Sequence, residues 1–308
     1  MTGLEIGPLN KPRFSKADYR VKYVDHAHRD DLVASYAQTA DMADELVNIV
    51  DIDYVWDGTR PLSSVVGDDG PFDFIFASHV VEHVPNLVGW LRELATVLPD
   101  DGRLYLAIPD KRLTFDVNRS VTGMADVMDA HLTARTSPNY RQIWDFHSNM
   151  LIVDPGAMWA GTVNYDGRLR TDVEPDAWAL SLCERSDSPG EYVDSHCWVF
   201  TPTSFLRLYQ RLVNLDLIDY RIAEFEPSQP GTIEFRVVLE RLPVALSDGE
   251  RRARQLASIP TVNDVVPPPP ALGESTSMTM TLSPKEMAFI IRKRRTLERA
   301  RALLMRRR

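Results

Sequence analysis

The sequence predicts a doubly wound α/β fold, in which helices cover both faces of a mainly parallel sheet and a cap subdomain follows the fifth strand. Residues 72–110 run from an apolar segment through an amphipathic one to a second apolar segment, which is typical of a strand–helix–strand crossover. Shorter apolar segments with polar ends precede this stretch. Ninety residues, 111–200, then separate the fifth strand from the next regular helix, too many for a bare connection.

The crossover has clear boundaries. Residues 72–77 are apolar and β-prone, as expected for a strand buried on both faces. Asn86 can cap the helix that follows, and the turn Pro-Asp-Asp-Gly at residues 99–102 ends it. Because ligands of such sheets bind beyond the carboxyl ends of the strands, we expect residues 78–83 and Asp110 to face the site. The apolar stripe of the helix is formed by Leu87, Leu91, Leu94 and Leu98.

The first two strands end in residues suited to binding a nucleoside. A short strand at residues 4–6 ends at Gly7, and a second strand ends at Asp25, where a carboxylate can accept hydrogen bonds from ribose hydroxyls. Gly7 is equally compatible with an ordinary strand-to-turn glycine. For Asp25 the alternative is a solvent-facing turn residue, but its separation from Gly7 favours the ribose role. Pro8 and Leu9 follow Gly7, so the full G-x-G-x-x-G motif of nicotinamide dinucleotide sites is missing.

The segment between the second strand and the crossover predicts a helix at residues 30–47 and a third strand at residues 48–56. Asp57 and Gly58 close that strand, which places the Asp57 carboxylate at the same edge of the sheet as Asp25. Asp53 is a reserve candidate, although its alternation with Ile52 favours a polar strand face.

Residues 72–110 resemble the class I S-adenosylmethionine (SAM) methyltransferases, specifically the methyltransferase domain 11 group. That group has a comparable aspartate-led strand, a His-Val loop, a helix and a turn before the next strand. The turn here is PDDG, where the family more often has Pro-Gly-Gly. The resemblance spans residues 1–110 and 201–242. It implies a seven-stranded Rossmann-like sheet and SAM as cofactor, with S-adenosylhomocysteine as the product.

The resemblance also implies roles for individual residues. In these enzymes the first strand ends in an acidic residue followed by a glycine, and an acidic residue holds the adenine amino group, with an apolar side chain (here Trp56 or Leu62) on the ring. The implied cofactor-binding residues are Glu5, Gly7, Asp25, Asp57 and Ser78.

His79 is the leading candidate for a general base, because it follows the fourth strand directly and histidine titrates near neutral pH. A scaffolding role for His79 fits the sequence equally well. His83 is a frequent structural histidine of the family. His147 and His196, in the insertion, are reserve catalytic candidates.

The insertion at residues 111–200 is expected to form a substrate cap. It contains four of the six tryptophans and three of the seven histidines. Aromatic faces beside polar side chains suit a sugar, although a plain cap core explains most of the tryptophans. The runs PDKRLTFD and GEYVDSHCWVFTP further resemble a bacterial subgroup linked to surface-polysaccharide synthesis. A divalent metal is not favoured, because its candidate ligands follow no recognised spacing: Asp145, His147, Glu191, Asp194 and His196.

Charge and cysteine content limit the class of protein. The net charge is −9, and residues 284–308 contain ten Lys/Arg against two Glu, a net of +8, so the remainder carries −9 − 8 = −17. An acidic body is repelled by phosphate backbones, which argues against a nucleic-acid substrate. Two cysteines, the lack of an apolar run near 18 residues and the lack of a secretory signal favour a cytoplasmic protein.

Residues 243–308 are expected to form a linker and a tail. Residues 243–283 contain a proline run and a Ser/Thr/Gly-rich stretch, typical of a linker, and residues 284–308 form a basic amphipathic helix. Such a helix suits an anionic membrane surface or a partner protein, and a solvated tail fits equally well. A homo-oligomer is compatible with the sequence.

Taken together, the residues and the resemblance predict methyl transfer from SAM to a hydroxyl acceptor, first a sugar or surface glycan. The alternatives are a carboxylate, an amine or a natural-product hydroxyl as acceptor, or a non-catalytic SAM-binding scaffold.

Overall fold

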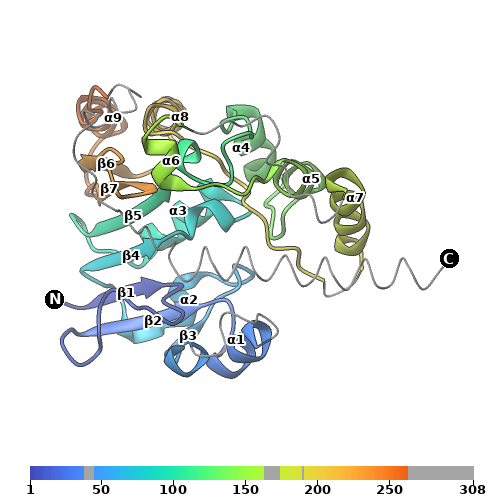
Figure 1. Cartoon of the computed structure of the whole chain (residues 1–308). Coiled ribbons are helices and arrows are strands. Elements are labelled where there is room, and N and C mark those ends of the chain that lie inside the picture. Colours follow the sequence, from blue (N-terminus) through green and yellow to red (C-terminus); the bar gives the residue numbers. More distant parts are fainter. Residues whose placement is uncertain (38–44, 163–173, 189–190, 263–308) are drawn as a thin grey trace, which may run out of the picture.

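Seven strands form a single sheet in the computed structural model, which describes residues 1–37, 45–162, 174–188 and 191–262 (Figure 1). Their order is β3-β2-β1-β4-β5-β7-β6; the five strands β1 to β5 run parallel, and β7 lies antiparallel between β5 and β6. The predicted seven-stranded α/β sheet is therefore confirmed. The strands are β1 Gly3–Ile6, β2 Val21–Asp25, β3 Tyr54–Val55, β4 Phe74–Ser78, β5 Arg103–Pro109, β6 Tyr220–Glu226 and β7 Glu234–Arg241.

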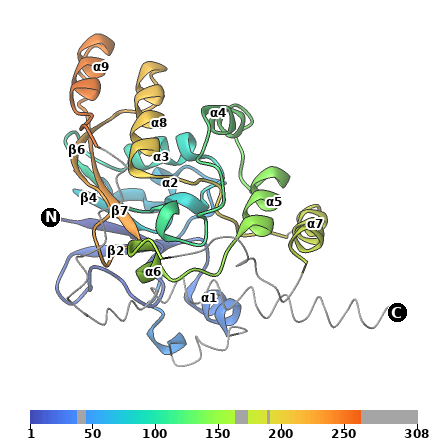
Figure 2. The same cartoon turned by 45° about the horizontal axis from the view of Figure 1, so that its top comes forward.

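Helices connect the strands and cover the sheet (Figures 1 and 2). They are α1 Arg29–Tyr36, α2 Leu62–Val66, α3 Leu87–Thr96, α4 Met124–Leu132, α5 Tyr140–Asn149, α6 Pro155–Trp159, α7 Pro175–Ser186, α8 Pro202–Asn214 and α9 Asp248–Ala257. Short 3₁₀ turns lie at η2 Leu46–Asn48, η3 Gly67–Asp69, η4 Val81–His83 and η5 Lys111–Leu113. Within the described part of the chain, none of the helices has the length and apolarity to cross a membrane.

The point at which the strand order reverses lies between β1 and β4. Ile6 at the end of β1 pairs with Val24 on one side and with Ala77 on the other. Gly7, Asp25 and Ser78 therefore follow three neighbouring strands at one edge of the sheet. Such switch points are where ligands of open α/β sheets bind.

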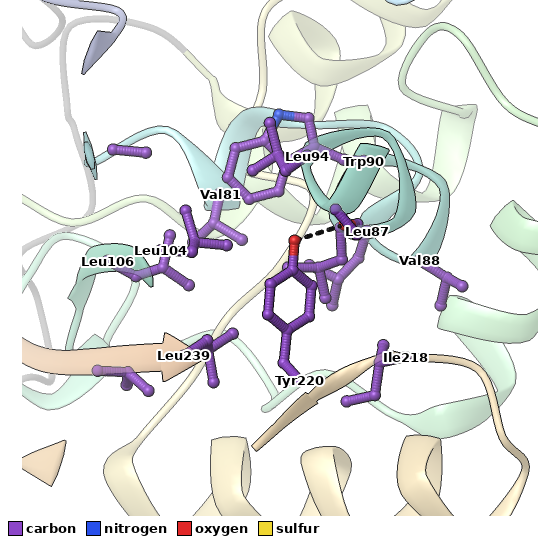
Figure 3. Close-up of a cluster of buried hydrophobic side chains, with 14 of the residues drawn as sticks. Val81, Leu87, Val88, Trp90, Leu94, Leu104, Leu106, Ile218, Tyr220 and Leu239 are labelled. Carbon is purple, nitrogen blue, oxygen red and sulfur yellow. Dashed lines mark hydrogen bonds between the residues drawn. The ribbon is translucent and has the colours of Figure 1, made fainter. Parts of the chain in front are cut away.

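The core between the sheet and α3 forms as the sequence predicts. The Asn86 side chain caps α3 by accepting a hydrogen bond from the Gly89 N–H. The leucine stripe of α3 is buried against β4 and β5. The buried Tyr220 of β6 reaches into this core and donates its hydroxyl to the Leu91 carbonyl at 3.0 Å (Figure 3).

The predicted cap, residues 111–200, contains two different kinds of structure. Helix α4 packs against α3, and its buried residues belong to the main core. Helices α5 and α7 pack against each other around a small core of their own, away from the sheet (Figures 1 and 2). The separate part of the insertion thus begins after α4. The small core consists of Ile143, Trp178, Leu182, Cys183 and Val193.

The third strand is shorter than the predicted one. Only Tyr54–Val55 pair as a strand, and the expected start of the strand is a 3₁₀ turn, Leu46–Asn48. The Asp53 carboxylate accepts a hydrogen bond from the Tyr23 N–H at 2.7 Å, so Asp53 ties the segment to β2 by its side chain. The helix expected at residues 30–47 ends at Tyr36, and residues 38–44 lie outside the described residues.

The prediction of a linker over residues 243–283 is wrong for residues 248–257, which form a helix. Ser247 and Glu250 form a capping box that starts helix α9, and α9 packs on α8 and β6. Gln255 of α9 is 1% exposed and donates to the carbonyls of Ile218 and Tyr220. The low apolar content of this helix concealed it, because one large apolar residue, Leu256, packs against the core and hydrogen bonds from Gln255 supply much of the remaining attachment. Residues 263–308, with the predicted tail, lie outside the described residues.

Candidate cofactor and acceptor site

Glu5 lies under the loop that follows β1. It is 3% exposed, and its two carboxylate oxygens accept hydrogen bonds from the backbone N–H groups of Arg13 and Phe14, at 2.7 and 3.0 Å. Glu5 therefore shapes the wall of the site by fixing the loop. A direct contact between Glu5 and the cofactor stays a prediction.

Gly7 and Leu9 turn the chain at the end of β1. Gly7 has φ 64°, in the left-handed region that glycine adopts without steric cost. Leu9 has φ 47°, so the residue that replaces a second glycine keeps a glycine-like backbone. The loop thus retains the turn that a nucleoside site requires, although its sequence departs from Gly-x-Gly.

Asp25 lies beside Gly7 on the neighbouring strand and is 9% exposed. Its Oδ1 accepts a hydrogen bond from the His26 N–H at 2.8 Å and lies 2.7 Å from His26 Nδ1. In the described part of the chain, Oδ2 makes no hydrogen bond. This oxygen can accept a hydrogen bond, and its position at the end of β2 fits a ribose hydroxyl as the donor.

The residues predicted around the adenine ring differ in how far they can reach a ligand. Asp57 is exposed and accepts hydrogen bonds from the Thr59 N–H and hydroxyl, which hold the pKa of its carboxyl below the usual range. Trp56 lines the same strand end and donates to the Arg60 carbonyl. Leu62 is completely buried, so it cannot stack on an added ring. The carboxylate of the reserve candidate Asp53 instead accepts a hydrogen bond from the Tyr23 N–H of β2.

His79 lies directly after Ser78 at the end of β4 and has φ 53°. Its N–H donates to the Ala107 carbonyl, and its side chain is 10% exposed. Nε2 lies 2.6 Å from Oε2 of Glu234, and Nδ1 lies 3.8 Å from Oε1 of Glu82. Burial raises the pKa of Glu234, but His79 and Arg236 outweigh this effect and hold it below the usual range.

Glu234 was missed in the sequence, whereas Glu82 was expected in the loop that faces the site but was given no role. Glu234 lies 155 positions from His79 and meets it only because β7 is inserted next to β5. Glu82 precedes the frequent family histidine at position 83, a local signal that could have identified it.

The reserve histidines lie in a buried layer under the cap. His196 is 5% exposed, with Nδ1 2.5 Å from the Asp116 carboxylate and its ring stacked on Phe146. His147 is 7% exposed, and its Nε2 lies 3.1 Å from the Ser195 hydroxyl. The structure thus brings His196 next to the loop after β4, where its ring lies against that of His83, and it brings His147 to Ser195.

Arg119 organises this buried layer and was also missed. It donates to Asp116 and Asp145 and to the His196 carbonyl, each at 2.8 Å. Burial opposes the charge on Asp116, but His196 and Arg119 outweigh it and hold its pKa below the usual range. Arg119 and its partners therefore join the start of the insertion to its end.

The five metal-ligand candidates of the cap do not gather at one place. The Asp145 carboxylate binds Arg119, and Glu191 pairs with Arg185 at the surface. Asp194 and His196 instead approach the loop after β4, where Asp194 lies 2.8 Å from His83 Nδ1.

The two sequence runs singled out in the insertion lie side by side. Asp110 and Phe200 form a parallel bridge, and the Lys111 N–H donates to the Phe200 carbonyl. The Cys197 N–H donates to the Glu82 carbonyl at 2.6 Å. The strand-like segment at residues 194–200, which we name the strap, therefore closes over the carboxyl ends of β4 and β5.

A seven-stranded sheet of this order, with its switch point between β1 and β4, defines a Rossmann-like α/β protein. A family model described as a methyltransferase domain matches residues 14–217, more than half of the chain. The chain belongs to this family and is a class I SAM-dependent methyltransferase. Its cofactor is SAM, and Gly7 and Asp25 fit that cofactor as described above.

Solved structures with a similar fold include other methyltransferases. A SAM-dependent methyltransferase from Methanosarcina mazei is 14% identical over 78% of this chain and 92% of its own, with a TM-score of 0.37. Magnesium protoporphyrin IX methyltransferase from Synechocystis PCC 6803, solved with bound SAH, is 12% identical over 78% and 74%, with a TM-score of 0.34. CurJ carbon methyltransferase is 14% identical over 79% of this chain, which spans 49% of that protein, with a TM-score of 0.35. No curated protein matches the sequence.

Proposed function

We propose that this enzyme transfers the methyl group of SAM to a hydroxyl group of a sugar or surface glycan. One observation carries the proposal: a histidine, His79, lies at the carboxyl end of β4 with its ring held by a carboxylate 2.6 Å away. A histidine oriented by a carboxylate is the arrangement expected of a general base for a hydroxyl proton.

The chemistry divides between the cofactor and the chain. SAM supplies an electrophilic methyl group, which the acceptor oxygen takes with release of S-adenosylhomocysteine. Glu234 accepts the Nε2–H of His79 and so fixes the tautomer in which Nδ1 carries the lone pair. His79 then takes the hydroxyl proton on Nδ1, and Glu234 stabilises the imidazolium that results. Alignment of the acceptor by the strap and the cap provides the rest of the rate enhancement over the uncatalysed reaction.

The cap supports a sugar as acceptor. Three of its four tryptophans are wholly or largely buried, as the core interpretation predicted, but Trp144 on α5 is 39% exposed. Trp144 precedes Asp145, whose carboxylate is held by Arg119. An exposed indole on the cap suits the C–H face of a sugar.

Two variants test the function, with SAH binding by calorimetry and methyl transfer to a panel of sugars as the two measurements. His79→Ala is expected to lower turnover by about 100-fold or more while SAH affinity stays within about threefold, because a base acts only in the reaction. Asp25→Ala is expected to weaken SAH binding by about tenfold through loss of a charge-assisted hydrogen bond.

The outcomes separate the alternatives. Full turnover in His79→Ala would end the role of His79 as base, and unchanged SAH affinity in Asp25→Ala would remove Asp25 from the site. Product formed only from carboxylates, amines or natural-product hydroxyls would replace the sugar as acceptor. SAH binding without product from any acceptor would favour the scaffold.

A further inference from the structure

Glu82 has a buried carboxylate oxygen that lacks a hydrogen-bond partner. Glu82 lies in the turn η4 between β4 and α3 and is 2% exposed. Among the described residues, nothing donates a hydrogen bond to its Oε2. A buried carboxylate oxygen without a hydrogen-bond partner destabilises the fold, because it has lost its hydration without a replacement. The site therefore calls for a group that can bind this oxygen, and a cation does so best.

Two imidazoles approach the same carboxylate. His83 comes from the same turn, and His196 comes from the strap, and one ligand atom of each lies within 4.8 Å of the others and of Glu82. His83 Nε2 lies 3.9 Å from Glu82 Oε1. That distance is too long for a hydrogen bond. It is shorter than two zinc–ligand bonds placed in line, which span about 4.2 Å.

The other ring nitrogen of each histidine is held by a carboxylate. His83 Nδ1 lies 2.8 Å from Asp194, and His196 Nδ1 lies 2.5 Å from Asp116. A carboxylate at Nδ1 accepts the N–H there and leaves the lone pair on Nε2. Histidines that bind metals usually make this second bond, which sets the tautomer and the ring orientation.

We propose that Glu82, His83 and His196 bind one divalent transition-metal cation, with Zn²⁺ as the best match. Two imidazoles and one carboxylate are the ligands of open zinc sites, whereas Mg²⁺ and Ca²⁺ prefer oxygen ligands. Among the described residues, the carboxylates of Glu82, Asp116 and Asp194 lie at the site, and Arg119 pairs with one of them, Asp116, so the local charge favours a cation.

The ligands of the proposed site differ from the metal-ligand candidates that the sequence suggested. Those five candidates all lie in the insertion, whereas Glu82 and His83 lie in the loop after β4 and only His196 lies in the strap. The strap is already attached to this loop through the Glu82 carbonyl. A cation here would fix the closed position of the strap whichever acceptor is methylated, so the inference does not depend on the proposed function.

The test measures metal binding directly. The full chain, purified without a polyhistidine tag and stripped with a chelator, is titrated with ZnCl₂ in a calorimeter and with CoCl₂ by visible absorption. We expect one equivalent of Zn²⁺ with micromolar or tighter affinity, and a cobalt spectrum typical of low coordination number. Glu82→Gln and His196→Gln should each weaken zinc binding by about 100-fold or more. His28→Gln, at an exposed histidine before α1, is the matched control and should bind as the parent does.

Each outcome decides the inference. The absence of a stoichiometric zinc site in the parent chain would overturn it, as would parental affinity in both Glu82→Gln and His196→Gln. SAH binding by each variant reports whether it is folded, and if Glu82→Gln does not fold, His83→Gln takes its place with the same expected loss. Since zinc is titrated without SAM or an acceptor, a failed zinc site and a failed methyl transfer are distinguishable.

Discussion

Leu9 holds a backbone conformation that residues other than glycine rarely adopt. Its φ of 47° carries a cost of about 1–2 kcal/mol for an L-residue with a side chain. The side chain is 3% exposed and packs with Leu32 and Ile49 under α1. Burial of a leucine contributes about 1.5–3 kcal/mol, which offsets the strain. Leu9 therefore takes the place of the second glycine, and its buried side chain anchors the loop.

This balance predicts an unusual order of stabilities. Leu9→Ala should lower the free energy of unfolding by about 2–4 kcal/mol. Leu9→Gly should be no less stable than Leu9→Ala, because glycine relieves the strain. The matched pair Leu32→Ala and Leu32→Gly, inside α1, should show the ordinary order, with glycine worse by about 1 kcal/mol. Urea unfolding measures all four variants, and a Leu9→Gly protein clearly weaker than Leu9→Ala would contradict the strain argument.

The turn that connects α3 to β5 also holds a residue other than glycine at positive φ. Asp101 has φ 63° in the Pro-Asp-Asp-Gly turn, where the resembled family more often has glycines. Its N–H donates to the Arg241 carbonyl at 3.0 Å, a bond that glycine would keep. The turn thus connects two well-formed elements through one residue in an unfavourable conformation.

Asp101→Gly is therefore expected to stabilise the protein by about 0.5–1 kcal/mol, since aspartate tolerates this region better than most residues but not as well as glycine. Asp100→Gly is the matched control: Asp100 has no positive φ, so glycine there should be neutral or destabilising. Thermal unfolding should show the midpoint rising by about 1–3 °C for Asp101→Gly alone. An equal response in both variants would mean that the conformation at position 101 carries no strain.

Elements with a strong local pattern could be predicted from the sequence. The α3 helix has both a cap and an apolar stripe, and β4 and β5 are uniformly apolar, so their places were clear. Two elements lacked such a signal. β3 keeps only two paired residues because Asp53 ties the preceding segment to β2 through its side chain. Helix α9 has few apolar residues, and Gln255 attaches it to the carbonyl groups of Ile218, just before β6, and Tyr220, a contact that no sequence pattern reveals.

The site at the scale of the whole molecule could be predicted only in part. Gly7, Asp25, Ser78 and His79 end strands that the topology brings together, so their shared edge followed from the strand order. Other groups of the site come from remote segments: Glu234 from β7, and the paired Asp116 and His196 from the two ends of the insertion. The first contact depends on where β7 enters the sheet and the second on how the insertion folds back over it, and local patterns contain no information about either path.

The outer edge of the sheet offers the last prediction. An exposed edge strand is open to pairing with other chains, and β6 is such an edge. Helix α9 covers it through Gln255, which donates to the Ile218 carbonyl at 2.7 Å and to the Tyr220 carbonyl at 3.0 Å. Gln255→Ala should lower the free energy of unfolding by about 2–4 kcal/mol, because two buried hydrogen bonds are lost together. Arg254→Ala, at the exposed neighbouring position, should change it by less than about 0.5 kcal/mol. Urea unfolding measures both variants, and equal values would mean that the Gln255 hydrogen bonds add nothing to the stability of the sheet, whereas the expected difference would make α9 a stabilising part of the methyltransferase fold.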